Sequence, residues 1–308
     1  MELPRDTTIV AAVSRLALNT NQNTLRCFRA DSPLTEEARE VIYKHPDLCS
    51  LLIVISKSTI LPTIILPNLT NIEIEYEKDD DWQQVFHGAS LGKLASVKIS
   101  SNLDSVGNFL GEFANVTLAT SIPTTLSEFM FYTRTKCSPD YRSLLPFTQL
   151  QKLDIDFTCR FGCSSTIDDA TITDLAQAMP KLEVLRLGDR PCETPAGVTM
   201  KGLASLAYYC PHLFDLLIHF QVTGLDLLTT PRFASVDESV PRVDCALPFL
   251  QVGCIRVPEG SALIVASTLL KIFPNLNRIQ CFLPELGWEE VWKIIKDSRP
   301  RPQRSSKK

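Results

Sequence analysis

The sequence has few of the residues on which most catalytic sites depend. It contains 4 His and 12 Gly among 308 residues. No Ser or Cys stands in a recognisable nucleophile motif, and no glycine-rich phosphate-binding loop is present. The neighbouring carboxylates Glu73, Glu75 and Glu77 share one face of a predicted strand, without the burial that would separate their pKa values. We therefore expect a protein that is not an enzyme and that carries no cofactor.

Long apolar runs are also missing. No run reaches the roughly 18 residues that a membrane-spanning helix needs. The first residues, MELPRDTT, are charged and do not form a signal peptide. These absences predict a protein of the cytoplasm or the nucleus that has no membrane partner.

Positive charge is scarce outside the last eleven residues. The formal net charge is −4, and the segment SRPRPQRSSKK (298–308) holds five of the 31 basic residues. The remaining chain is therefore more acidic than the total suggests, which argues against a protein that follows a nucleic-acid backbone. We predict that 298–308 is a disordered basic tail and that 1–297 forms one domain.

The ten cysteines do not suggest a disulfide framework. Cys49, Cys210 and Cys281 occupy apolar positions of the pattern described below, where a free thiol packs as a small hydrophobic group. The pairs Cys159/Cys163 and Cys210/His212 have loose ligand spacing, but a zinc site needs two converging pairs. We expect structural cysteines in a reducing compartment and no metal.

One pattern recurs along the chain: Pro-x-Leu-x-x-Leu-x-apolar. Chance predicts roughly half of one full match, and five occur. They begin at Pro46, Pro67, Pro180, Pro211 and Pro274. A sixth, at Pro248, departs only at Gly253. Leucine triplets without the proline extend the series to ten, opening at Leu25, Leu48, Leu69, Leu94, Leu126, Leu150, Leu182, Leu213, Leu250 and Leu276.

The spacing of the leucines indicates the local structure. Apolar residues at i, i+3 and i+5 combine a short turn with a strand of period two, so that the second and third leucines face one side. The proline ends the preceding helix, and its fixed φ suits a turn. Each repeat is too small to bury its apolar face alone, but stacked repeats form one core. We predict an α/β leucine-rich repeat solenoid of horseshoe shape, about ten strand units long, with parallel strands on the concave face and helices on the convex face.

Apolar periodicity places further elements between the strands. Asp168 or Asp169 caps a helix that runs to Met179, and residues 250–257 form the ninth strand. Residues 221–246 form an excursion loop with a short helix at 225–228. Residues 286–295 form an amphipathic helix that covers the end of the array, and residues 7–18 form an N-terminal helix.

The phrases ATITDLAQAMPKLEVLRLGDRPCETPAGVTMKGLASLAYYCPHLFDLLIHF and LPFLQVGCIRVPEGSALIVASTLLKIFPNL resemble the leucine-rich region of fungal F-box-like proteins. The resemblance covers roughly residues 20–283. It implies a solenoid that presents target proteins to a cullin-RING ubiquitin ligase, with an F-box that docks a Skp-type adaptor. Residues 1–24 offer one short helix and no F-box pattern, so an adaptor is expected only if an F-box lies upstream. A structural or scaffolding leucine-rich repeat protein without a link to ubiquitin is the alternative.

The candidate binding residues flank the buried leucines and would line the concave face. They are Glu73, Glu75, Met130, Tyr132, Asp154, Asp156, Arg186, Asp215, Leu217, His219 and Arg256. The middle of this surface is acidic and its C-terminal third carries arginines, so a protein target with a basic or mixed-charge face would suit it. Aromatic and Met side chains at its centre are types that anchor interfaces. The alternative is that these charges only solvate the strand face.

Overall fold

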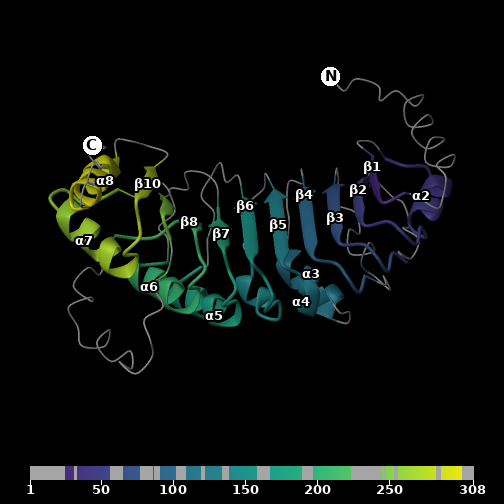
Figure 1. The fold of residues 1–308 in the computed structure, drawn as a ribbon, viewed down its shortest axis with the longest axis horizontal. Coiled ribbons are helices and arrows are strands. Elements are labelled where there is room, and N and C mark those ends of the chain that lie inside the picture. Colours follow the sequence, from purple (N-terminus) through teal and green to yellow (C-terminus); the bar gives the residue numbers. More distant parts are fainter. Residues whose placement is uncertain are drawn as a thin grey trace, which may run out of the picture. The chain divides into compact units, whose positions relative to one another are not determined.

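The structure is a computed structural model. It describes residues 25–30, 33–55, 65–76, 86, 91–101, 109–118, 122–133, 139–157, 167–188, 197–222, 245, 247–252, 256–281 and 286–299. The chain divides into an N-terminal unit, Met1–Thr166, and a C-terminal unit, Ile167–Lys308. Each unit is a stack of strand-and-turn repeats with parallel strands, which confirms the predicted α/β leucine-rich repeat fold (Figure 1).

The N-terminal unit contains six parallel strands whose spatial order follows the sequence. They are β1 (Cys27–Arg29), β2 (Ser50–Ile55), β3 (Asn71–Tyr76), β4 (Ser96–Ser101), β5 (Glu128–Thr133) and β6 (Lys152–Phe157). The described helical segments between them are α2 (Glu36–Ile42), α3 (Phe109–Leu118), α4 (Ile122–Thr125) and the 3-10 helix η2 (Tyr141–Leu144).

In most repeats the first leucine closes a turn, as its spacing predicted, whereas the amide of Leu126 donates to the carbonyl of Ile122 at 2.9 Å, at the end of α4. Where a proline precedes the first leucine, that proline is the second residue of a four-residue turn: the amide of Leu69 donates to the carbonyl of Leu66 at 3.1 Å, across Pro67. Proline favours this position because its φ is already correct. From β2 to β6 the strand begins two residues after the first leucine. These first leucines are fully buried: Leu48, Leu69, Leu94, Leu126 and Leu150.

Aromatic side chains join the helical layer to the sheet in the N-terminal unit. Phe113 on α3 lies 4.7 Å from Phe129 on β5 and 5.6 Å from Phe147, measured between ring centroids. Phe109 stacks on Phe131 at 4.0 Å. Phe129 and Phe131 of β5 therefore point to the core. Because neighbouring strand residues point to opposite faces, the residues between them point away from it.

The C-terminal unit contains four parallel strands, again in sequence order. They are β7 (Val184–Leu187), β8 (Asp215–Ile218), β9 (Phe249–Val252) and β10 (Arg278–Cys281). The helices are α5 (Asp169–Ala178), α6 (Met200–Tyr209), α7 (Ala262–Ile272) and α8 (Trp288–Asp297). The predicted terminal helix is confirmed as α8, which packs on α7 and β10 and buries Trp288 against Phe220 with ring centroids 5.7 Å apart.

The ninth repeat corrects the sequence prediction. β9 covers residues 249–252, not 250–257, and Leu250 pairs with Ile279 of β10 and Leu216 of β8. The repeat therefore opens three residues earlier, at Leu247, which is fully buried. Pro248 misled the prediction because it follows the first leucine here, whereas in the five full matches it precedes that leucine by two residues.

Successive repeats of the C-terminal unit are joined through helix ends. Asp168 caps α5, because its Oδ1 accepts the amide of Thr171 at 2.7 Å. Asp169 instead reaches the next helix, where its Oδ1 accepts the amides of Thr199 at 2.7 Å and Gly202 at 3.0 Å. Its Oδ2 accepts the Thr199 hydroxyl at 2.7 Å. The two adjacent aspartates thus cap two different helices.

Two buried thiols make a second set of contacts between repeats. The Cys210 thiol donates to the carbonyls of Ala176 at 3.7 Å and Met179 at 3.6 Å. The Cys245 thiol donates to the carbonyls of Cys210 and Leu213, both at 3.6 Å. Burial raises the pKa of Cys210 to about 12, with a smaller contribution from Cys245. Cys210 is therefore the structural thiol that its apolar position indicated.

Some predicted features lie outside the described residues: the helix at 7–18, the helix at 225–228, the Cys159/Cys163 pair and most of the basic tail. At the start of that tail, Arg299 is described, and its guanidinium donates to the carbonyls of Pro274 and Leu276. Among the described residues, no helix is both long and apolar enough to cross a bilayer.

Candidate functional site

Most of the candidate residues lie on the face of the parallel strands that points away from the core, called here the open face. In the N-terminal unit, alternate strand residues form three rows across the strands. The first row is Cys27, Ser50, Asn71, Ser96, Glu128 and Lys152; the second is Arg29, Leu52, Glu73, Lys98, Met130 and Asp154; the third is Val54, Glu75, Ser100, Tyr132 and Asp156. Six predicted residues therefore share one surface: Glu73, Glu75, Met130, Tyr132, Asp154 and Asp156.

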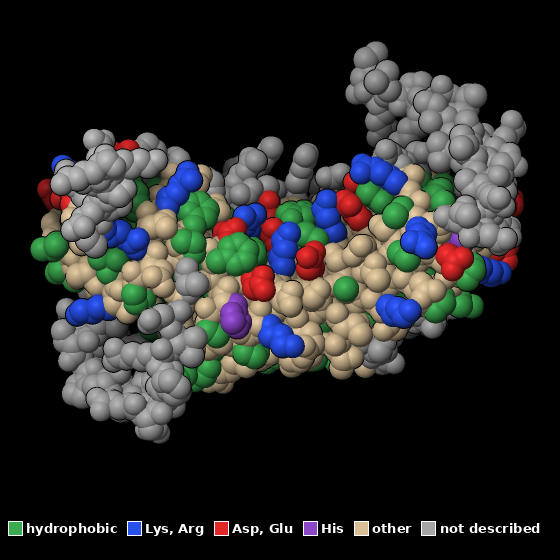
Figure 2. Space-filling view, viewed as in Figure 1, with side chains coloured by type: hydrophobic (Ala, Val, Ile, Leu, Met, Phe, Trp, Pro, Cys, Tyr) green, Lys and Arg blue, Asp and Glu red, His purple; other side chains and the backbone are tan. Residues whose placement is uncertain are grey.

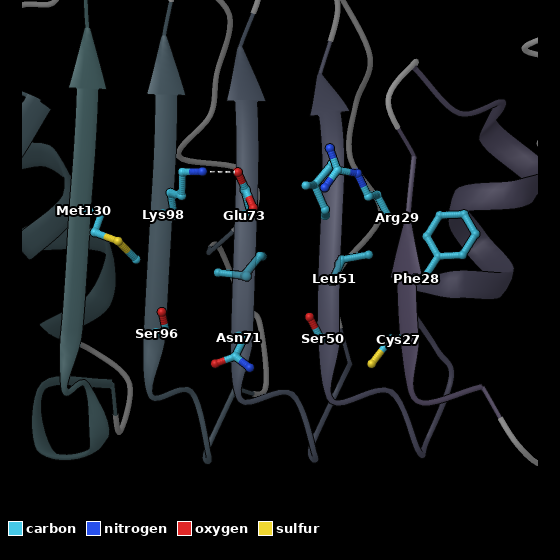
Figure 3. Close-up of a pocket in the computed structure, with 12 residues that line it drawn as sticks. Cys27, Phe28, Arg29, Ser50, Leu51, Asn71, Glu73, Ser96, Lys98 and Met130 are labelled. Atoms are coloured by element: carbon cyan, nitrogen blue, oxygen red, sulfur yellow. Dashed lines mark hydrogen bonds and ion pairs between the residues drawn. The ribbon is translucent and has the colours of Figure 1, made fainter.

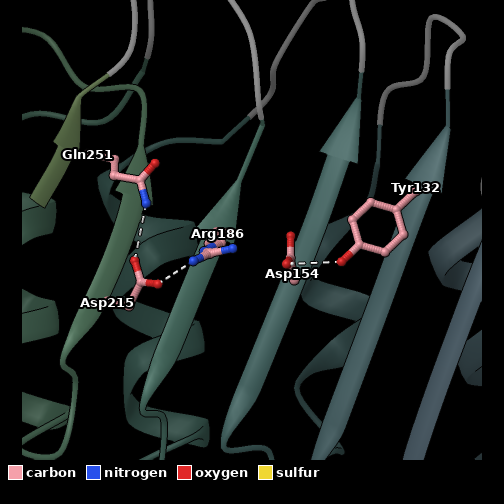
Figure 4. A network of polar contacts seen from close by, with 5 residues as sticks. All are labelled: Tyr132, Asp154, Arg186, Asp215 and Gln251. Carbon is pink, nitrogen blue, oxygen red and sulfur yellow. Dashed lines mark hydrogen bonds and ion pairs between the residues drawn. The ribbon is translucent and has the colours of Figure 1, made fainter. Parts of the chain in front are cut away.

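Cross-strand contacts order the middle of this open face. Lys98 and Glu73 form an ion pair with 2.5 Å between Nζ and Oε1, and the Lys98 ammonium lies 5.9 Å from the centroid of the Tyr132 ring. The Tyr132 hydroxyl donates to Oδ2 of Asp154 at 3.1 Å (Figure 4). Each contact joins adjacent strands, where side chains on one face stand about 5 Å apart. Tyr132 is therefore held between β4 and β6.

Exposure differs sharply among these residues. Asp154 is only 6% exposed, whereas Glu75, Met130, Tyr132 and Asp156 are half-buried. Figure 2 shows acidic, basic and hydrophobic side chains interspersed on the visible face. Half-buried aromatic and sulfur-containing side chains beside fixed charges are typical of a surface that binds another macromolecule.

The open face of the C-terminal unit carries a second polar network. Arg186 on β7 and Asp215 on β8 form an ion pair with 2.5 Å between Nη2 and Oδ2. The Gln251 amide on β9 donates to Oδ1 of Asp215 at 3.5 Å (Figure 4). At the edge, the guanidinium of Arg278 on β10 lies 5.3 Å from the centroid of the Phe249 ring. The predicted residues Arg186 and Asp215 are thus neighbours.

Leu217 and Arg256 do not form the exposed binding surface in this unit that the sequence predicted. Leu217 lies in register with Arg186 and Gln251, but it is only 4% exposed, because it stands on an inner strand between two long side chains. Arg256 lies beyond the end of β9 and is exposed outside any strand, as a result of the misplaced ninth repeat. It is therefore not in register with the other candidates.

His219 follows the last residue of β8 and is half-buried. Burial lowers its pKa below the usual value of 6.5. The ring lies against Gly188, whose missing Cβ would stand 3.4 Å from the His219 Cδ2. Gly188 has a φ of +85°, which glycine adopts without strain. The imidazole is thus packed against backbone rather than projected into solvent.

The sequence prediction missed Phe249 and Gln251, the open-face residues of β9. The alternative triplet Leu247, Leu250 and Val252 would have found them, because it gives the same i, i+3, i+5 spacing. Open-face residues are the second and fourth after the leucine that opens the repeat, as Ser50 and Leu52 are after Leu48, so their assignment depends on where the repeat opens.

The open face of the N-terminal unit is hollowed over β1–β5. A pocket of about 310 Å³ lies there, lined mainly by residues of the first two rows (Figure 3). No group of three or more His, Cys, Asp or Glu side chains in the described part of the chain is placed to hold a metal ion. The contacts described on the open faces are hydrogen bonds, ion pairs and contacts of cations with aromatic rings.

No protein-family model and no curated protein matches the sequence. A chain in the crystal structure of the Rad7 and Elc1 complex in yeast is similar in structure, with 15% identity and a TM-score of 0.37 over 91% of this chain and 84% of that chain. A likeness at this level does not assign a function.

Proposed function

We propose that this chain is a non-enzymatic protein-interaction module that binds a target protein through the open faces of its parallel strands. The observation that carries the proposal is the ordered open face of the N-terminal unit. Tyr132 is fixed there by the Asp154 carboxylate and lies near the Lys98 ammonium. Side chains that are already held in place lose less conformational entropy on binding, which favours association.

The surrounding residues suit a protein partner better than a small substrate. Met130 and Tyr132 supply apolar contact area at the centre, and charged residues lie on both sides of them along the second and third rows. An apolar centre with a polar rim is the usual arrangement of protein interfaces. The contacts Glu73–Lys98, Tyr132–Asp154 and Ser96–Glu128 join side chains of neighbouring strands on this face, and this ordering supports a surface for association.

We further propose that the target-binding role belongs to an F-box-like ubiquitin-ligase subunit of fungal type. The support is the resemblance of the repeated helix-Pro-x-Leu-x-x-Leu phrases to the leucine-rich region of those proteins. In such a subunit the repeats select the target, and an F-box supplied elsewhere in the protein contacts a Skp-type adaptor. The open faces described above would then be the selecting surface.

Site-specific photo-crosslinking tests the proposal. Benzoylphenylalanine is placed at Met130 on the open face and, as a matched control in the same unit, at the exposed Asn115 on α3. Both variants are irradiated in a fungal lysate, and the products are identified by mass spectrometry. We expect a discrete crosslinked protein from position 130 that is absent from position 115.

The outcomes separate the levels of the proposal. Identical products from both positions, or products from position 115 alone, would refute binding through the open face. A specific product at 130 without any co-purified cullin or Skp-type adaptor would favour a scaffolding protein unconnected with ubiquitin. Turnover of any substrate by the purified chain would overturn the non-enzymatic assignment.

A further inference from the structure

The pocket on the open face of the N-terminal unit lies where short side chains stand beside longer ones. The first row carries short residues on its first four strands: Cys27, Ser50, Asn71 and Ser96. In the second row, three of these strands carry the longer Arg29, Glu73 and Lys98. The difference in length leaves the space of about 310 Å³, and Met130 of β5 lines its end (Figure 3).

The charged side chains around this pocket are already engaged. Lys98 pairs with Glu73 at 2.5 Å, and Glu128, at the Ser96 end, accepts the Ser96 hydroxyl at 3.1 Å. Arg29 likewise has an interaction of its own. Two positive and two negative charges therefore balance one another among these described residues. A charged ligand would lose its hydration here without gaining an unoccupied counter-ion, so the pocket favours a neutral one.

The polar groups that remain suit a peptide backbone. In the described part of the chain, the side chains of Ser50 and Asn71 form no hydrogen bond, and both line the pocket. Ser50 is half-buried and Asn71 is exposed. A side-chain amide donates to a carbonyl and also accepts from an N–H, so Asn71 can pair with the backbone of an extended segment.

Met130 supplies apolar surface at the β5 end of the pocket. Its half-buried side chain extends from β5 toward β4, at a height between Ser96 and Lys98 (Figure 3). A thioether side chain adapts to irregular apolar partners. Met130 and Asn71 stand two strands apart, which is roughly 10 Å, or about three residues of extended chain. A segment that pairs with Asn71 can therefore place one side chain against Met130.

We propose that this pocket receives an uncharged apolar side chain, of the size of Leu or Met, from an extended segment of a partner protein. Met130 contacts that side chain, and the Asn71 amide pairs with the backbone of the segment. This inference rests on the proposed function, and it adds the chemical class of the contact. The pocket volume lies at the lower end of the range of about 300–1,000 Å³ for ligand sites, which suits one side chain and its flanking backbone.

Peptide binding to the full chain tests the inference. The probes are fluorescein-labelled decapeptide pools with blocked ends, in which a central residue is fixed as Leu, Asn, Glu or Lys and all other positions are uncharged polar mixtures. Leu and Asn have nearly the same size, so this pair isolates polarity. Fluorescence anisotropy measures the dissociation constant of each pool. We expect the Leu pool to bind at least about fivefold more tightly than each of the other three.

Two pairs of variants locate the contact. Met130→Gln keeps the length of the side chain but makes it polar, and it should reduce the preference for Leu over Asn to less than about twofold. Leu118→Gln makes a similar change at an exposed position on α3 and should leave the preference unaltered. Asn71→Ala should weaken all four pools by about threefold, because they share one backbone, whereas Asn115→Ala on α3 should not. Circular dichroism confirms that each variant is folded.

Several results would overturn the inference. These are equal affinity for the Leu and Asn pools, preference for the Glu or the Lys pool, absence of measurable binding by the Leu pool, an unchanged Leu preference in Met130→Gln, or unchanged binding in Asn71→Ala. The crosslinking experiment at Met130 does not depend on these pools. A partner captured there without any Leu preference would sink this inference and leave the proposed function standing, whereas failure of both experiments would remove both.

Discussion

Replacement of Asp169 by alanine should destabilise the C-terminal unit by about 2–3 kcal/mol. The substitution removes three hydrogen bonds, two from the backbone amides of Thr199 and Gly202 and one from the Thr199 hydroxyl. Loss of a helix cap typically costs about 1 kcal/mol, and a hydrogen bond to a charged group contributes about 1.5–3 kcal/mol. The contacts are only partly buried, so water replaces part of each, and we take a value well below the simple sum.

Equilibrium urea unfolding followed by circular dichroism measures this effect. At an m-value of about 2 kcal/mol/M, the expected loss lowers the midpoint by roughly 1–1.5 M. Asp169→Asn is the matched control, because an amide oxygen can still accept from both backbone amides, and it should lose less than half as much. The reasoning fails if Asp169→Ala lowers the free energy of unfolding by less than about 0.5 kcal/mol. It also fails if Asp169→Ala and Asp169→Asn are equally stable.

Gly202 provides a second test of the same contact. A Cβ at Gly202 would lie 2.7 Å from the Asp169 Oδ1 and 2.9 Å from a methyl carbon of Val198. In the native background Gly202→Ala should therefore destabilise the protein, although alanine in a helix is ordinarily better than glycine by about 1 kcal/mol. In the Asp169→Ala background the cost should shrink, and additive effects of the two substitutions would contradict the proposed cap.

Three further predictions concern packing and charge. Phe113→Ala should cost about 3–5 kcal/mol in urea unfolding, because Phe113 is fully buried among aromatic rings, whereas Phe113→Leu should cost less than half of that. A double-mutant cycle on Arg186 and Asp215 should give a coupling of about 0.5–1 kcal/mol that falls in 1 M NaCl, because the Arg186 side chain is 40% exposed; a coupling insensitive to salt would contradict this. Burial lowers the pKa of His219, so the unfolded chain takes up a proton before the folded chain does as the pH falls. Urea unfolding at several pH values should therefore show that the contribution of His219 to stability is complete above about pH 6.5 and declines below it. This decline should be smaller in His219→Gln.

The repeat pattern predicted the sheet well because its signal is local. A leucine in a turn, followed by apolar residues at i+3 and i+5, leaves little freedom in which face a strand buries, and the pattern placed Glu73, Tyr132 and Asp154 on one face in agreement with the register. It failed at β9, because two triplets three residues apart share Leu250. The first residue of the turn, fully buried at Leu247, decides between them, and burial is not visible in a single sequence.

Contacts between repeats could not be predicted from the sequence, because they join residues that lie far apart in the chain. Sequence alone left open whether Asp168 or Asp169 caps the helix, and the structure uses both, one for its own helix and one for the next. The second role spans thirty residues and depends on how closely α5 and α6 pack. The pocket likewise arises from short side chains on four separate strands, and its shape follows only once their register is known.

The buried thiol of Cys210 can report how often neighbouring repeats of the C-terminal unit separate. With its pKa raised to about 12, almost none of it is thiolate at neutral pH, and the sulfur is enclosed by the carbonyls of the preceding repeat. Alkylating reagents attack thiolates, so Cys210 reacts only when adjacent repeats separate and solvent enters. The alkylation rate of Cys210, measured by peptide mapping relative to that of the exposed Cys27, therefore reports how often one repeat separates from the next in the native protein.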